Sequence, residues 1–132
     1  MAQGSTARRP VGYQVAYLRK DFTFADLEVG GGVVGHIPGG SRILRLTVVT
    51  SAAFDDDTAD DLDVGFSLGG DELGAAMDIN TATIDTGDVA AADVFVAADA
   101  TVYFAPETAA TGNGTTGAGS IIVEFIPPDE LG

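Results

Sequence analysis

Residues 36–54 decide the fold, and they read His-Ile-Pro-Gly-Gly-Ser-Arg-Ile-Leu-Arg-Leu-Thr-Val-Val-Thr-Ser-Ala-Ala-Phe. The run opens with a turn, because Pro38 fixes φ and the two glycines after it tolerate backbone angles that other residues avoid. It then alternates, and the residues on one predicted face are Leu44, Leu46 and Val48. A second alternating run covers residues 62–68, after the acidic residues 55–61. Two alternating runs joined by a polar loop predict an antiparallel hairpin at the centre of the core.

Short apolar or alternating runs predict further strands along the chain. They cover residues 13–18, 22–24, 26–35, 89–96, 100–105 and 120–126. Residues 71–77 have the spacing of a single helical turn, with acids at its start. Residues 80–88 predict a polar loop whose Ile84 plugs into the core. Seven to eight short strands predict an all-β fold, an antiparallel β-sandwich or jelly-roll.

The domain organisation follows from length and composition. At 132 residues, with 45% hydrophobic and 20% charged residues, the chain has room for one core and should fold. Residues 1–10 lack large apolar side chains after the initial Met, so we expect a flexible basic N-terminal arm there, carrying Arg8, Arg9 and Pro10. Residues 11–132 are expected to form a single β-sandwich domain. No cysteine is present, which excludes disulfides and thiolate chemistry.

Charge is distributed unevenly along the chain, which carries a net charge of −14. The lysines and arginines all lie in the first 45 residues, and they are Arg8, Arg9, Arg19, Lys20, Arg42 and Arg45. The acid-rich remainder would repel phosphates, so we expect no nucleic-acid partner. No apolar run approaches the roughly 20 residues of a membrane helix, so we expect no membrane partner. The asymmetry is compatible with a basic side that meets an acidic partner and an acidic side in solvent.

Catalytic and metal chemistry find little support in the residue pattern. The one histidine, His36, lies beside a turn, and no Gly-x-Ser-x-Gly motif is present to supply a nucleophilic serine. We expect no enzyme activity, no catalytic residue and no cofactor. The acidic run could offer oxygen ligands to Ca²⁺, and the candidates are Asp55, Asp57, Asp60 and Asp61. The run lacks the glycine and glutamate of an EF-hand loop, so the sequence predicts no defined metal site.

The last strand and the loop before it are the other candidate surfaces. Residues 120–126 are apolar on both faces except at Glu124, which is typical of a strand that is central or buried at an interface. We therefore expect Ile122, Phe125 and Ile126 to lie at a contact between copies of the chain. Residues 106–119 read as a long exposed loop, and loops of this length are often functional.

Several of these segments together resemble a known kind of protein. The segments are Ile37-Pro38-Gly39-Gly40, the strand that ends in Ala53-Phe54, the run Leu62-Asp63-Val64-Gly65, residues 71–81 and the last strand. They resemble small virion proteins of tailed phages and related viruses, over about half of the chain. The resemblance implies a structural protein of the particle, of the head decoration type. It further implies a homotrimer on the major capsid protein lattice, at the capsid surface of a virion made in the host cytoplasm.

Two other functions stay open at this point. The first is a tail or fibre component that binds a receptor or glycan through loops such as residues 106–119. The second is a Ca²⁺-dependent or carbohydrate-binding β-sandwich module of cellular origin. The absence of tryptophan leaves little aromatic surface on which a sugar ring could stack. The leading hypothesis is therefore a protein that binds and stabilises the assembled capsid.

Overall fold

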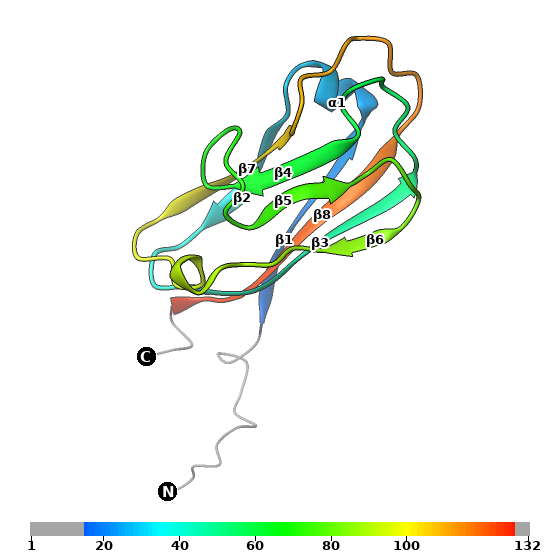
Figure 1. Ribbon diagram of the computed structural model, residues 1–132. Helices are drawn as coiled ribbons and strands as arrows, with labels where there is room; N and C mark the ends of the chain where they lie inside the picture. The colour runs from blue at the N-terminus through cyan, green and yellow to red at the C-terminus, as the bar shows by residue number, and fades with distance from the viewer. Residues whose placement is uncertain (1–14, 129–132) are drawn as a thin grey trace, which may run out of the picture.

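The computed structural model describes residues 15–128 as a sandwich of two four-stranded antiparallel sheets, shown in Figure 1. One sheet has the order β1-β8-β3-β6, and the other has the order β2-β7-β4-β5. The strands are β1 (Ala16–Thr23), β2 (Gly32–Ile37), β3 (Arg42–Ala52), β4 (Asp61–Gly65), β5 (Gly74–Asp78), β6 (Ile84–Thr86), β7 (Ala100–Pro106) and β8 (Ala118–Ile126). A short helix, α1 (Phe24–Glu28), and a 3₁₀ turn, η3 (Ala91–Asp93), complete the elements. The predicted all-β sandwich is confirmed.

The strand pairing identifies the sandwich as a jelly-roll. β1 pairs with β8, β2 with β7, β3 with β6, and β4 with β5. This nesting is that of one long hairpin, with its tip between β4 and β5, wrapped into two sheets. Wrapping then places β3 beside β8 and β4 beside β7, which joins the nested pairs. Both described ends of the chain therefore lie at one end of the sandwich (Figure 1).

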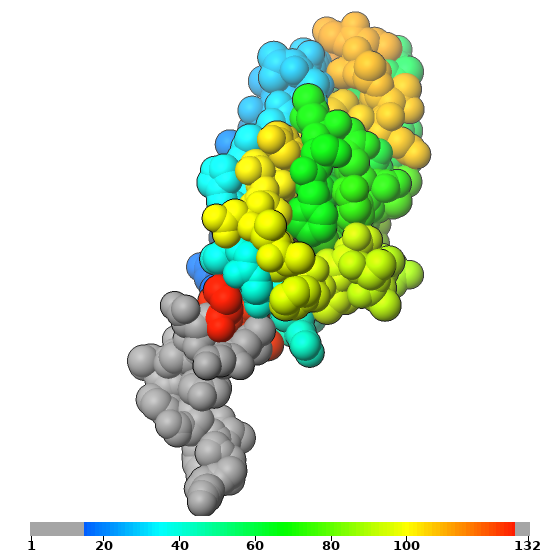
Figure 2. Space-filling model, turned by 90° about the vertical axis from the view of Figure 1, so that its left-hand side faces the viewer, coloured from blue at the N-terminus to red at the C-terminus, as the bar shows by residue number. Residues whose placement is uncertain are grey.

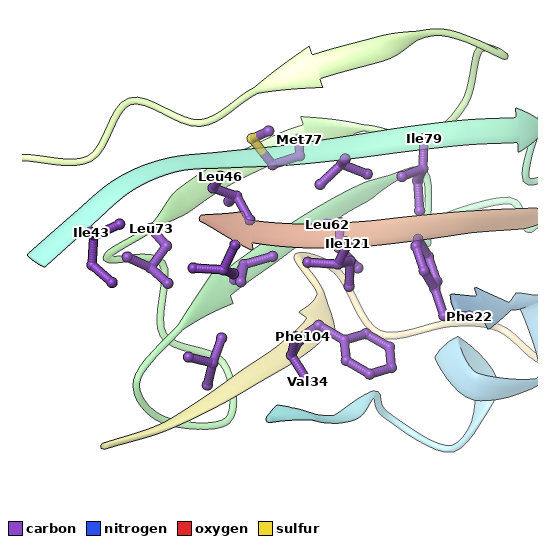
Figure 3. Close-up of a cluster of buried hydrophobic side chains, with 14 of the residues drawn as sticks. Phe22, Val34, Ile43, Leu46, Leu62, Leu73, Met77, Ile79, Phe104 and Ile121 are labelled. Atoms are coloured by element: carbon purple, nitrogen blue, oxygen red, sulfur yellow. The ribbon is translucent and has the colours of Figure 1, made fainter. Parts of the chain in front are cut away.

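The core lies between the inward faces of the two sheets, as Figure 3 shows. β8 supplies three inward residues, Ile121, Val123 and Phe125, which alternate with more exposed residues as a central antiparallel strand requires. Phe22 of β1 connects the two layers. Its ring stacks on Phe54 at a centroid distance of 5.2 Å and packs against Phe104 of β7 at 5.5 Å.

The predicted central hairpin is wrong. β3 and β4 are strands with alternating burial, but they belong to different sheets, because a jelly-roll connects its third and fourth strands across the sandwich. The predicted inward face of β3 is also partly wrong. The register shifts between Ile43 and Arg45, so Ile43 is buried while Leu44 is 45% exposed. A bulge of this kind turns the alternation over by one residue.

Four local predictions are also wrong. Residues 71–77 form no helical turn, and residues 74–78 are strand β5 instead. Residues 84–86 form the edge strand β6, and Ile84 is 67% exposed rather than plugged into the core. Residues 89–96 form no strand but contain the turn η3. Phe24 begins α1 instead of continuing a strand, and the same helix covers residues 26–28, so the strand predicted over residues 26–35 begins only at Gly32. All four segments lie at edges or connections, where local propensity competes with packing.

Candidate functional site

The acidic run after β3 is part of two paired loops, residues 53–60 and 107–117, at the end of the sandwich far from the last residues of β8 (Figures 1 and 2). Asp56 is the centre of the pairing, and its side chain is buried. Its carboxylate accepts hydrogen bonds from the backbone N–H groups of Thr58 (2.9 Å) and Thr111 (3.0 Å). It also accepts from Ala59 N–H (3.1 Å) and Gly112 N–H (3.2 Å). One carboxylate thus satisfies donors from both loops.

The neighbouring acids extend the pairing. Asp55 accepts hydrogen bonds from the N–H groups of Thr115 (2.7 Å) and Thr116 (2.9 Å). Asp57 accepts one from the Asn113 side-chain amide (2.6 Å), and its own N–H donates to the Asn113 side-chain oxygen (3.2 Å). Residues 107–117 are therefore held along most of their length, although they contain no large apolar residue.

Hydrogen bonding lowers the pKa of two of these acids. The Thr115 hydroxyl, followed by the N–H groups of Thr116 and Thr115, lowers the pKa of Asp55 to about 2. The Thr58 N–H is the largest cause that holds the pKa of Asp56 well below its ordinary value, and burial opposes it. Both carboxylates are thus ionised acceptors at neutral pH, as the pairing requires.

Asp61, at the start of β4, has the opposite shift. Burial raises its pKa, and the charges of Asp60, Glu107 and Asp78 raise it further. Three acids thus lie around a fourth. The ionised form of Asp61 is therefore disfavoured by its surroundings.

The Ca²⁺ candidates do not converge. Asp55 and Asp57 use their carboxylates as acceptors for threonine and asparagine donors, whereas Asp60 and Asp61 lie on the β4 side of the loop. Among residues 15–128, no group of three or more acidic or histidine side chains has a geometry that could hold a metal ion. Asp55 and Asp56 instead use their carboxylates to bind backbone N–H donors of the paired loops.

His36 lies at the end of β2, beside a shallow depression of about 410 Å³. Its Nδ1 atom is 3.1 Å from the Thr101 hydroxyl. The nearby Asp99 carboxylate accepts the Gly39 N–H at 2.8 Å and so caps the turn after β2. The arrangement is that of a hydrogen-bonded turn. The Asp99 carboxylate binds the Gly39 N–H, whereas the His36 ring is paired with the Thr101 hydroxyl, so the two do not form the carboxylate–imidazole pair of a catalytic triad.

The predicted contact residues on β8 divide between its two faces. Phe125 is 5% exposed and belongs to the core, whereas Ile122 and Ile126 are partly exposed on the solvent side. The arm residues Arg8, Arg9 and Pro10 lie outside the described residues. Within the described part of the chain, no helix is long and apolar enough to cross a membrane.

Sequence reasoning missed the role of the acids and the threonines that they bind. The local part of the signal was visible, since Asp-x-Thr spacing at residues 56–58 is typical of an Asx-turn. The hydrogen bonds between the two loops could not be predicted, because Thr111 and Asp56 are 55 residues apart in the sequence.

No protein-family model and no curated protein sequence matches the chain. Solved structures do match it. A chain of the cyanophage Pam1 capsid asymmetric unit is 16% identical with a TM-score of 0.67, covering 96% of this chain and 98% of that one. A chain of the Ralstonia phage GP4 capsid is 16% identical with a TM-score of 0.58, covering 86% of this chain and 84% of that one.

A third similar chain belongs to the acid-stable capsid structure of the Helicobacter pylori bacteriophage KHP30. It is 12% identical with a TM-score of 0.55, and the match covers 88% of this chain and 90% of that one. At these identities the likeness shows the fold. The jelly-roll described above is therefore a fold that phage capsid structures contain, as the resemblance of the sequence to small phage virion proteins led us to expect.

Proposed function

We propose that this chain is a non-enzymatic structural protein of a tailed-phage virion, which binds and stabilises the assembled capsid as a head decoration protein. The observation that carries the proposal is the match to the Pam1 capsid chain, because it spans nearly the whole of both chains. The paired loops support a structural role, since the carboxylates of Asp55 and Asp56 accept hydrogen bonds from backbone N–H groups.

The proposed partner is the major capsid protein, and the proposed location is the capsid surface. The N-terminal arm, with Arg8, Arg9 and Pro10, would contact acidic groups of the shell. β1, the first strand after the arm in the sequence, begins at the end of the sandwich opposite the paired loops (Figure 1). The acidic loops would then face solvent while the basic arm faces the shell, and this charge distribution would orient the encounter. We propose that the protein acts as a homo-oligomer, with a trimer as the favoured state.

Titration onto isolated shells tests the proposal. Expanded heads that lack the protein should bind the purified chain to saturation, at a fixed ratio to the major capsid protein, as measured by co-sedimentation. Deleting residues 1–10 should weaken this binding. Replacing Arg8 and Arg9 by glutamine should weaken it as well, while the matched replacement by lysine should retain most of it, because lysine keeps the charge. Non-saturable binding would contradict the proposal.

Immunogold labelling of intact virions separates the head from the tail. Label over the head is the expected result. Label confined to the tail or fibres would replace the decoration function with the tail alternative. In that case, binding to a glycan array would point to receptor recognition.

A further inference from the structure

The sheet β1-β8-β3-β6 has one face on the core and the other in solvent. Its solvent-side residues form rows across the strands, because the register pairs Tyr17 with Glu124 and Glu124 with Arg45. The next row contains Arg19, Ile122 and Thr47. We call these residues, together with Val15, Asp21 and Ile126, the outer face.

Apolar side chains are exposed on the outer face. Tyr17 is 65% exposed, and Ile122 lies on the neighbouring strand in the next row, opposite Arg19. With Val15, Arg19 and Glu124 they line a shallow groove of about 430 Å³. An amphipathic ring such as that of tyrosine beside an aliphatic side chain is typical of the centre of a protein–protein contact.

The charges of the outer face are already paired within the chain. The Arg19 guanidinium lies 2.9 Å from the Asp21 carboxylate, and that of Arg45 lies 3.0 Å from the Glu124 carboxylate. Two cations and two anions give this face no net charge. A surface that is neutral and apolar at its centre suits a partner with the same properties, because burying it leaves no charge uncompensated.

The charge of the described surface differs between the two sheets. Among residues 15–128, every lysine and arginine lies in β1 or β3 of this sheet. The strands of the other sheet contain Asp61, Asp63 and Asp78 and no lysine or arginine. Two copies that approached through β4 and β5 or through the paired loops would bring carboxylates together, and like charges at a contact are disfavoured. On the outer face, in contrast, two such acidic chains can meet with the charges already paired.

We propose that the outer face is the contact between copies of this chain. The inference rests on the proposed function, since it names the surface through which the expected homo-oligomer forms. Tyr17 and Ile122 form its apolar centre. The ion pairs Arg19–Asp21 and Arg45–Glu124 keep the face neutral around this centre. Ile126 extends this face, and Phe125 takes no part because it belongs to the core.

Sedimentation velocity of the full chain, without shells, tests the inference. The wild-type chain should sediment as one oligomer at micromolar concentration. Tyr17→Asp should weaken self-association by about tenfold or more, because a charge would enter the apolar centre. The matched control is Leu68→Asp, which changes a residue of similar exposure (61%) in the loop after β4 and should leave the oligomer unchanged. A monomeric wild-type chain, or equal behaviour of the two variants, would overturn the inference.

Charge exchange provides a second test that does not disturb the apolar centre. Arg45→Glu should dissociate the oligomer at low salt, because it leaves the outer face negative. The double variant Arg45→Glu/Glu124→Arg should restore it, since the face is again neutral. Thermal melts check that each variant is folded. If Tyr17→Asp does not fold, Tyr17→Ser replaces it in the sedimentation experiment. A variant that becomes monomeric yet still binds shells leaves the decoration function intact, whereas an oligomer that binds no shell contradicts that function alone.

Discussion

Replacing Gly117 by alanine tests how the paired loops join the core. Gly117 has a φ of +146°, a conformation that side chains rarely adopt. A Cβ atom there would lie 2.3 Å from the Phe54 ring. That ring cannot retreat, because it is buried and stacked on Phe22. Backbone strain of about 1–3 kcal/mol and overpacking of about 1–3 kcal/mol together predict a loss of about 2–6 kcal/mol in the free energy of unfolding.

Gly112→Ala is the matched control. Gly112 also has a positive φ, of +87°, but an added Cβ would meet no atom within 4 Å. Only the conformational cost of about 1–2 kcal/mol applies there, and a less flexible unfolded chain offsets part of it. Urea denaturation should therefore show a clearly lower midpoint for Gly117→Ala than for Gly112→Ala, with similar slopes.

A double-mutant cycle identifies the cause. In a Phe54→Leu background the smaller side chain makes room, so Gly117→Ala should cost about 1–3 kcal/mol less than in the wild-type chain. Equal losses at Gly117 and Gly112, or a cycle with no coupling, would refute the proposed clash between Gly117 and Phe54.

Three further outcomes follow from the site. The depressed pKa of Asp55 gives stability that is fully present above its ordinary value of 3.8 and is lost as the pH falls through about 2, so acid melts should show little loss between pH 7 and pH 4 from this group. Asp61 has a raised pKa, which costs stability at neutral pH, and Asp61→Asn should therefore raise the melting temperature at pH 7; a lower melting temperature would contradict the assigned repulsion. Addition of Ca²⁺ should change neither the melting temperature nor the calorimetric heat, and a saturable heat would reveal a site that the described residues do not show.

The class of the fold could be predicted from the sequence, and its strand pairing could not. Alternation in β3 and β4 and the apolar run of β8 predict strands, because both patterns are local in sequence. Pairing in a jelly-roll is not local, since Ala16 of β1 lies opposite Phe125 of β8. The expectation of a hairpin between β3 and β4 failed for this reason. It applied a rule for sequential neighbours to a fold in which these two strands occupy different sheets.

The candidate contact residues of β8 and the acidic run could also be predicted only in part. β8 is apolar on both faces, so the sequence alone leaves open which of Ile122 and Phe125 points inward. The acidic run suggested cation ligands because local sequence shows the carboxylates. It does not show the N–H donors that reach Asp56 from residues more than 50 positions away. Sequence distance separated the two halves of the paired loops, and only the wrapped topology brings them together.

A cryo-EM map of the virion that contains this chain tests the central claim most directly. The account predicts copies of the jelly-roll on the outside of the head, at a fixed ratio to the major capsid protein, with the N-terminal segment of each copy against the shell. The same map would show whether copies meet through the outer face. Density for the chain on the tail alone, or no ordered density on the head, would contradict the account.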